Sequence, residues 1–202
     1  MESDGKAAAL CEQWLGELHD VNTGAVMTLG TGVGGGILID NRVLHGRDFQ
    51  AGELSWMIIN SGAGTQEMDA YTGKLCSAVG MVRAINKAIE NKDLNDGKAA
   101  FAAIKEENIK AKKIFQEYCR NVAIMILNIQ TIINGEKIVI GGGISVQPIS
   151  IEEIKRQFKL LLANNEMPRD QGTPPATKYR NDINLYGALY ALLLEINGQE
   201  VR

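Results

Sequence analysis

The chain contains the segment Ala25-Val26-Met27-Thr28-Leu29-Gly30-Thr31-Gly32-Val33-Gly34-Gly35-Gly36-Ile37-Leu38-Ile39, in which a glycine run separates two apolar stretches. The pattern predicts a buried strand at 25–29 and a second strand at 37–39, with the glycines of 30–36 between them. Because a strand and not a helix follows the glycines, the run differs from the Rossmann dinucleotide pattern, and it lacks the Lys-Ser/Thr of a P-loop. Glycines let backbone N–H groups approach an anion closely, so the run is a candidate phosphate-binding loop.

A second glycine run follows another predicted strand. Lys137-Ile138-Val139-Ile140 is mostly apolar and β-branched, and Gly141-Gly142-Gly143 comes directly after it. As in the first run, glycines at the end of a strand have no side chains to cover the backbone, so its N–H groups are accessible to a ligand. A simple turn without a ligand stays open as the alternative for each run.

The remaining apolar periodicity predicts helices that alternate with short strands, which indicates an α/β or α+β fold. Asp4 is a good N-cap for a first helix, and Asp40-Asn41 is typical of a hairpin turn into 42–44. The longest helix is expected over about 107–134, with Gly135 placed to end it. The other expected elements are helices over about 72–91, 95–103, 151–163 and 184–197, and strands over 54–59 and 176–180.

Composition narrows the class of protein. The chain has 202 residues, 45% of them hydrophobic and 22% charged, with a net charge of −3. A weakly acidic balance argues against nucleic acid as the main partner, no apolar run is long enough to span a membrane, and the first residues do not resemble a secretory signal. Cys11, Cys76 and Cys119 lie far apart without a CxxC pair, so we expect reduced, buried thiols and a cytoplasmic protein.

Several segments, in order, resemble the ROK (repressor, open reading frame, kinase) family. They are Leu29–Ile37, Gly52-Glu53-Leu54, Ile138–Ser145 and Asn184–Tyr190, and the opening Glu2–Leu10 resembles the family's segment around its catalytic aspartate. The resemblance covers nearly the whole chain. Members of this family are ATP-dependent sugar kinases or sugar-responsive repressors, with a two-lobed, actin-like, ribonuclease-H-like fold.

The resemblance implies an α/β fold that corresponds to the carboxy-terminal lobe of that architecture, with residues 1–202 as one domain. It also implies that the amino-terminal lobe is missing, since its Asp-x-Gly-Gly-Thr phosphate loop does not occur in the chain. The last helix, at about 184–197, is expected to belong with that lobe. Its apolar face would then be exposed unless it docks elsewhere or a dimer covers it; that face consists of Leu185, Leu189, Leu192 and Leu193.

The same resemblance implies roles for site residues. Asp4 would be the general base that accepts the proton of a sugar hydroxyl during attack on the γ-phosphate of ATP, while a helix N-cap is its alternative role. ATP would come with Mg²⁺, which neutralises phosphate charge. Gly30, Thr31 and Gly32 would contact the phosphates, and Gly141, Gly142 and Gly143 would lie beside the adenosine and the α-phosphate.

The resemblance also implies that Glu53 would bind sugar hydroxyls, since a carboxylate suits a pair of vicinal hydroxyls; a solvated charge at a strand end is the alternative for this residue. Ser3 stands where the family has asparagine, and Trp56 stands where it has a histidine that touches sugar and zinc. The family's CxCGxxGC zinc loop is also absent, because residues 60–76 contain only Cys76. We therefore expect no structural zinc and no other metal site.

Two functions follow from the resemblance. The first is ATP-dependent phosphorylation of a glucose-, fructose- or mannose-like hexose, by a chain that forms a homodimer or receives the missing lobe in trans. The second is a non-catalytic sugar- or nucleotide-sensing module derived from such a kinase. A DNA-binding repressor is a weaker third, because no helix-turn-helix precedes Asp4 and the net charge is −3.

Overall fold

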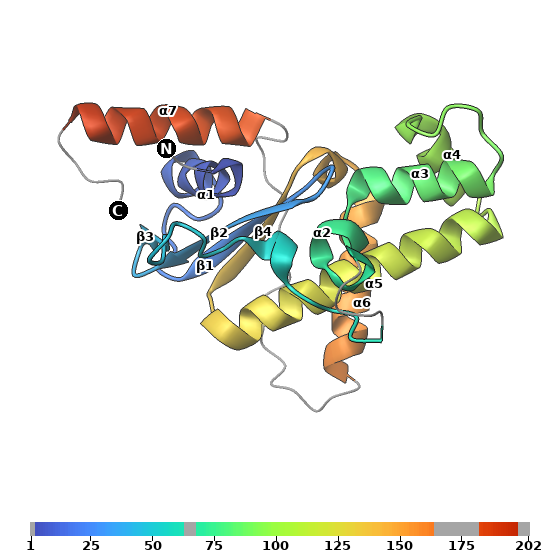
Figure 1. The fold of residues 1–202 in the computed structure, drawn as a ribbon, viewed down its shortest axis with the longest axis horizontal. Coiled ribbons are helices and arrows are strands. Elements are labelled where there is room, and N and C mark those ends of the chain that lie inside the picture. Colours follow the sequence, from blue (N-terminus) through green and yellow to red (C-terminus); the bar gives the residue numbers. More distant parts are fainter. Residues whose placement is uncertain (1–2, 63–67, 164–181, 198–202) are drawn as a thin grey trace.

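The computed structural model describes residues 3–62, 68–163 and 182–197. It contains a four-stranded mixed sheet in the order β3-β2-β1-β4 (Figure 1). β1 pairs antiparallel with β2 and parallel with β4, so that the two glycine runs begin at one edge of the sheet. The strands are β1 (Gly24–Leu29), β2 (Val33–Ile39), β3 (Arg42–Val43) and β4 (Lys137–Gly141).

The predicted glycine hairpin is confirmed, but its turn is shorter than expected. β2 begins at Val33, opposite Leu29, so Gly34, Gly35 and Gly36 are strand residues and only 30–32 form the turn. These strand glycines make room for helix α1 (Asp4–Leu15). A Cβ on Gly36 would lie 2.6 Å from the Ala9 Cβ, and a Cβ on Gly5 would lie 2.3 Å from the Gly35 carbonyl oxygen.

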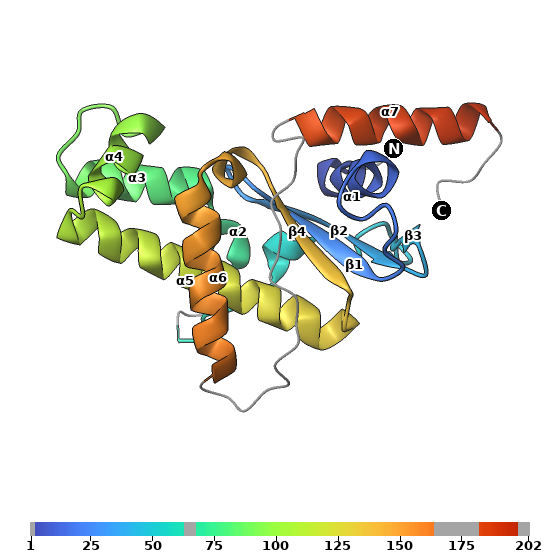
Figure 2. The same cartoon turned by 180° about the vertical axis from the view of Figure 1, so that it is seen from behind.

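Helix α7 (Ile183–Ile196) packs on α1, on the side away from the sheet (Figures 1 and 2). The helices approach closely, because a Cβ on Gly187 would lie 1.6 Å from the Ala7 carbonyl oxygen. The rings of Trp14 and Tyr190 stack with their centroids 4.9 Å apart. The last helix therefore docks within this chain, and whether it also contacts another lobe stays a prediction. Its outer face remains exposed at Leu185, Leu189 and Leu192.

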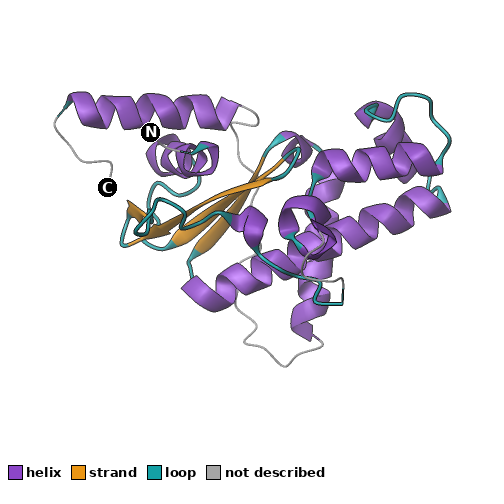
Figure 3. Ribbon diagram, in the orientation of Figure 1, coloured by secondary structure: helices purple, strands orange, loops and turns teal. Residues whose placement is uncertain are grey.

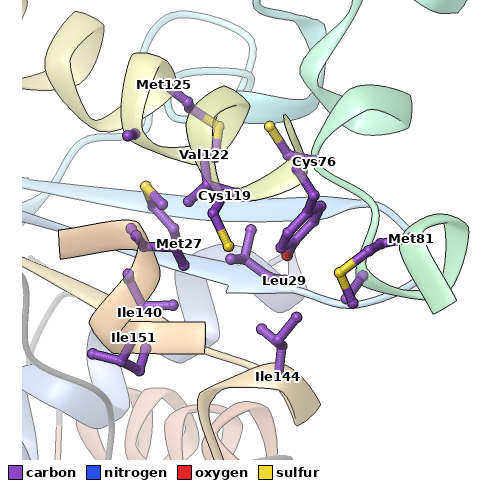
Figure 4. Packing of buried hydrophobic residues seen from close by; sticks show 14 of the residues in the cluster. Met27, Leu29, Cys76, Met81, Cys119, Val122, Met125, Ile140, Ile144 and Ile151 are labelled. Carbon is purple, nitrogen blue, oxygen red and sulfur yellow. The ribbon is translucent and has the colours of Figure 1, made fainter. Parts of the chain in front are cut away.

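Five helices lie on the other side of the sheet, where they enclose the main hydrophobic core (Figures 3 and 4). Met27 and Leu29 of β1 point into this core with Ile140 of β4, whereas Val26 and Val139 pack with α1. Both faces of these strands are thus buried, which explains their continuous apolar runs. The helices are α2 (Thr72–Leu75), α3 (Ala78–Ala88), α4 (Gly97–Lys105), α5 (Ile109–Ile133) and α6 (Pro148–Ala163).

Two predicted elements are wrong. The strand expected at 54–59 is instead the 3₁₀ helix η1 (Leu54–Trp56) with an isolated bridge between Ile58 and Tyr71. Leu54 turns inward because Gly35 opposite it has no side chain, and a Cβ there would lie 2.3 Å from the Leu54 Cγ. The single helix expected over 72–91 is two helices, α2 and α3, because Ser77 breaks the pattern as the N-cap of α3.

Smaller differences concern element ends. Ser3, not Asp4, is the N-cap residue of α1, and it makes no side-chain capping bond, so Asp4 is the first helical residue. α5 ends at Ile133, and its C-cap is Asn134, in a left-handed conformation with φ of 45°, one residue before Gly135. α6 begins at Pro148 and not at 151. The strand expected at 176–180 lies outside the described residues. Within the described residues, none of the helices has the length and apolar character needed to cross a membrane.

The contact between α1 and β2 predicts the effect of one added methyl group. Gly5→Ala should lower the free energy of unfolding by about 1–3 kcal/mol, because its Cβ would overlap backbone atoms of Gly35 that cannot move aside. Urea denaturation measures this difference. Gly97→Ala is the matched control, because a Cβ there meets nothing within 4 Å. Equal stability of the two variants would contradict the packing described here.

Candidate functional site

A cavity of about 410 Å³ lies where the parallel strands β1 and β4 end. Four elements that are far apart in the sequence contribute to it: the first turn of α1, the turn between β1 and β2, the loop after β4 and the first turn of α7. This is the edge of a sheet at which ligands commonly bind in α/β proteins. The lining residues are Asp4, Thr28, Leu29, Gly30, Thr31, Gly32, Val33, Gly34, Gly142, Gly143, Ile183 and Asn184.

Most of the residues predicted to bind the nucleotide thus line one cavity, together with the predicted general base. Asp4 shares this cavity with Gly30, Thr31 and Gly32 and with two of the three glycines of the second run, Gly142 and Gly143. The other predicted residues do not line it. Gly141 is the last residue of β4 and pairs with Thr28, while Ser3, Glu53 and Trp56 are absent from the lining.

Hydrogen bonds from the start of α3 fix the first glycine turn, residues 30–32. The Ser77 hydroxyl donates to the Thr31 carbonyl oxygen at 2.6 Å, and the Val79 N–H donates to the Gly30 carbonyl oxygen at 3.2 Å. The Ser77 Oγ also accepts from the Gly80 N–H at 2.9 Å, so one side chain caps the helix and fixes the turn. Sequence reasoning missed Ser77, because it lay inside the single helix predicted over 72–91; the preference of serine for helix N-caps was the available signal.

With its carbonyl groups tied to α3, the turn is free to present N–H groups to the cavity. The structure records no acceptor among the described residues for the N–H groups of Thr31 and Gly32, while the Gly30 N–H donates to the Gly32 carbonyl oxygen at 3.0 Å. A Cβ on Gly30 would meet nothing within 4 Å, so space lies directly beside the backbone. Accessible N–H groups of this kind are suited to bind phosphate oxygens.

The second glycine run is constrained by β1. Gly142 has a φ of 89°, and a Cβ on it would lie 2.3 Å from the Leu29 carbonyl oxygen. The Ser145 hydroxyl donates to the Gly142 carbonyl oxygen at 2.7 Å and fixes the following turn. Gly142 is therefore required by the fold. A substitution there would displace the backbone of β1, so lost ligand binding in such a variant would not show that Gly142 contacts the ligand.

Two buried polar atoms near Asp4 have no partner. The Ser3 Oγ and the Asn184 Oδ1 are both buried, and neither has a hydrogen-bond partner among the described residues. Asn184 lies in the first turn of α7 and lines the same cavity as Asp4, whose own side chain is exposed. Because buried polar groups without partners are rare, these atoms indicate a place where a polar ligand or water binds. Sequence reasoning used Asn184 only for the family resemblance.

A second hollow of about 690 Å³ adjoins the first and shares Leu29, Gly30 and Gly143 with it. Its walls come from α3, α4 and the segment that joins them, and they combine apolar and polar side chains. A planar, partly polar group such as a nucleobase suits such walls. The remaining lining residues are Ala78, Val79, Val82, Asp93, Asn95, Asp96, Gly97, Lys98, Phe101, Ile144 and Gln147.

Two of the three predicted sugar residues, Glu53 and Trp56, lie on the segment after β3, whereas Ser3 is the N-cap of α1. Gly52 turns the chain with a φ of 79°, and the Glu53 carboxylate that follows has its Oε1 3.6 Å from the Lys6 Nζ. Trp56 is 70% exposed, and its ring makes an edge contact with Tyr71, with centroids 6.1 Å apart. Glu53 therefore forms an ion pair with the helix that carries Asp4, although it is not among the residues that line the cavity.

The thiols are placed as buried core groups. Cys76 and Cys119 lie in the main core, as Figure 4 shows, and Cys11 is a residue of α1 that is buried in the smaller core between α1 and the sheet. Burial raises the pKa of the Cys76 thiol to about 12, and burial together with the Glu12 carboxylate does the same for Cys11. Among the described residues, no group of three or more His, Cys, Asp or Glu side chains is arranged to hold a metal ion.

The model of the ROK family matches residues 1–195. The chain belongs to the ROK family. The fold expected from the sequence is confirmed by a ROK family protein from Streptococcus pneumoniae, solved in complex with sucrose: it has 28% identity and a TM-score of 0.86, over 96% of this chain and 65% of that protein.

Two further ROK relatives carry activities in their names. A beta-glucoside kinase of Listeria monocytogenes is 28% identical over 99% of this chain and 66% of its own length. A glucokinase from Streptomyces griseus, solved with glucose and AMPPNP, has a TM-score of 0.80 at 23% identity, over 93% of this chain and 66% of that protein, and so shows the fold alone. The chain therefore spans just under two thirds of the length of each of these three relatives.

The burial of the cysteines predicts slow thiol chemistry. Because the thiolate is the reactive form and burial raises the pKa, the native thiols should react with Ellman's reagent at about pH 8 on the order of a hundredfold more slowly than in denaturant. A time course with and without guanidinium measures this. A thiol that reacts within seconds in the native protein would contradict its described burial.

Proposed function

We propose that this chain carries the nucleotide site and the general base of an ATP-dependent kinase that phosphorylates a hexose hydroxyl. The observation that carries the proposal is the cavity in which Asp4 and both glycine loops meet. Phosphoryl transfer depends on positioning and on stabilisation of charge, and a carboxylate beside two N–H-rich loops supplies both.

The glycine loops fit ATP in the following way. The N–H groups of Thr31 and Gly32 would bind phosphate oxygens, and Gly142 and Gly143 would border the nucleotide where the two hollows meet. The adjoining hollow beside Phe101 would take the base and ribose. ATP would bring Mg²⁺, which supplies charge neutralisation for the transferable phosphoryl group. Since the described residues form no metal cluster, we propose that the ion is held mainly by the nucleotide.

Asp4 would act on the sugar. Its exposed carboxylate, at the start of α1, accepts the proton of the hydroxyl that attacks phosphorus. The Glu53 carboxylate would hold neighbouring hydroxyls, Ser3 would donate a hydrogen bond in the place of the family's asparagine, and the Trp56 ring would cover an apolar face of the sugar. The name of the beta-glucoside kinase relative supports a glucoside, or glucose itself, as the sugar. A second copy of the chain, or an amino-terminal lobe supplied in trans, would complete the assembly.

A sensing module without turnover is the second candidate. It is favoured by one observation, that Glu53 and Trp56 line neither of the two hollows in which the nucleotide would bind. Saturable binding of ATP or sugar without formation of ADP distinguishes it from the kinase.

Asp4→Asn tests the role of Asp4 as the general base. The substitution keeps the shape of the side chain but removes its basicity, so turnover of glucose with Mg·ATP should fall by about a hundredfold or more while ATP affinity stays the same. Coupled detection of ADP measures the rate, and calorimetry measures the affinity. Asp20→Asn, in the exposed turn after α1, is the control. A full rate in Asp4→Asn would exclude this residue as the base.

Gly30→Ala tests the nucleotide site without disturbing the fold. A Cβ at this position meets nothing within 4 Å, and Gly30 borders both hollows, so the added methyl group should weaken ATP binding by roughly tenfold or more. Gly62→Ala is the control, because its Cβ would make only an ordinary contact, 3.5 Å from the Asn60 Oδ1. Unchanged ATP affinity in Gly30→Ala would place the nucleotide elsewhere.

A further inference from the structure

Lys6 has an unusual environment for a lysine. It lies in the first turn of α1, next to the run Ala7-Ala8-Ala9, and its side chain is only 1% exposed. A buried ammonium group is costly unless it is paired and hydrogen-bonded. Its Nζ donates to the Phe49 carbonyl oxygen at 2.8 Å and lies 3.6 Å from the Glu53 Oε1.

These two contacts hold one segment at both ends. Phe49 and Gly52 both have left-handed backbones, with φ of 57° and 79°, so the segment 49–53 folds back sharply on itself. Lys6 binds the carbonyl group at its start and the carboxylate at its end. The Glu53 side chain remains 32% exposed, so it is still accessible to a ligand.

Lys6 also lies close in sequence to the proposed base. Asp4 and Lys6 are two residues apart on one helix, which turns their side chains about 200° away from each other. Asp4 accordingly lines the cavity, while Lys6 reaches the segment of Glu53. A single rigid turn of α1 thus fixes both carboxylates.

We propose that Lys6 is a positioning residue, which sets the Glu53 carboxylate relative to Asp4 for a neutral polyhydroxyl ligand. The sugar part of this inference rests on the proposed function. The ammonium group neutralises the carboxylate, so the pair has no net charge to attract a cation. At Glu53, the site therefore favours an uncharged hydroxyl over a protonated amino group.

The first experiment measures the segment without any ligand. In Lys6→Met, backbone amides of the segment should exchange with deuterium faster, including the Ala51 N–H, which donates to the His45 carbonyl oxygen at 3.1 Å. Amides of β1 should be unchanged. Lys137→Met is the matched control, because it breaks the pair with Glu17, where the Nζ and Oε2 are 3.4 Å apart. Unchanged exchange of the segment in Lys6→Met would overturn the proposal.

The second experiment asks whether Lys6 acts through Glu53. Binding of glucose and of cellobiose is measured in the unmodified chain, Lys6→Met, Glu53→Gln and the double variant. Lys6→Met should weaken binding about tenfold when Glu53 is present and less than about twofold in the Glu53→Gln background. Equal losses in both backgrounds would show a merely structural role and overturn the proposal. Preferential binding of glucosamine by the unmodified chain would also overturn it.

Two results separate this inference from the proposed function. If the unmodified chain binds ATP and neither sugar, sugar recognition fails in both proposals, and deuterium exchange alone decides whether Lys6 holds the segment. If Lys6→Met does not fold, Lys6→Gln replaces it, because the amide can still donate to the Phe49 carbonyl oxygen but carries no charge. Lys6→Gln should then reproduce the loss of sugar affinity, and full affinity in this variant would overturn the charge argument.

Discussion

The site depends on a contact between two backbones that have no side chains between them. Gly5 of α1 lies against Gly35 and Gly36 of β2 so closely that no Cβ fits, and on its other side α1 meets α7 at Gly187. This approach places the helix directly on the sheet. The start of α1, which carries Asp4, consequently reaches the edge at which β1 and β4 end. A larger separation would move the carboxylate away from both glycine loops.

The pairing of β1 with β4 then determines which loops meet. The strands are parallel, so the turn after Leu29 and the loop after Gly141 emerge at the same edge of the sheet, although more than a hundred residues of chain separate them. The two loops are also held by different means. Ser77 of α3 fixes the carbonyl groups of the first, and the backbone of β1 restricts the second at Gly142. Because the protein groups are held in place beforehand, little has to be ordered when a phosphate binds.

Sequence patterns predicted the elements whose signals are local. The two glycine loops, the turn at Asp40-Asn41 and the long helix α5 follow from short segments of chain, whereas the grouping of Asp4 with the glycines was implied by the family resemblance and not by a local pattern. The errors arose where a distant contact determines the conformation. Glycines in β2 resemble a loop until α1 is packed on them, and the break at Ser77 depends on a hydrogen bond to Thr31, 46 residues away. Lys6 was missed because an isolated lysine near a helix start usually lies in solvent, and only the fold shows its burial.

Three consecutive residues of α1 therefore have three distinct tasks. Asp4 faces the cavity, Gly5 seats the helix on β2, and Lys6 reaches the segment that carries Glu53. Since adjacent residues of a helix point about 100° apart, the three residues of this one turn face three different parts of the structure. Any change at Gly5 would displace Asp4 and Lys6 together, so lost binding in such a variant would say nothing about either side chain. The roles of the two charged residues are separable only by substitutions that leave the glycine contact intact.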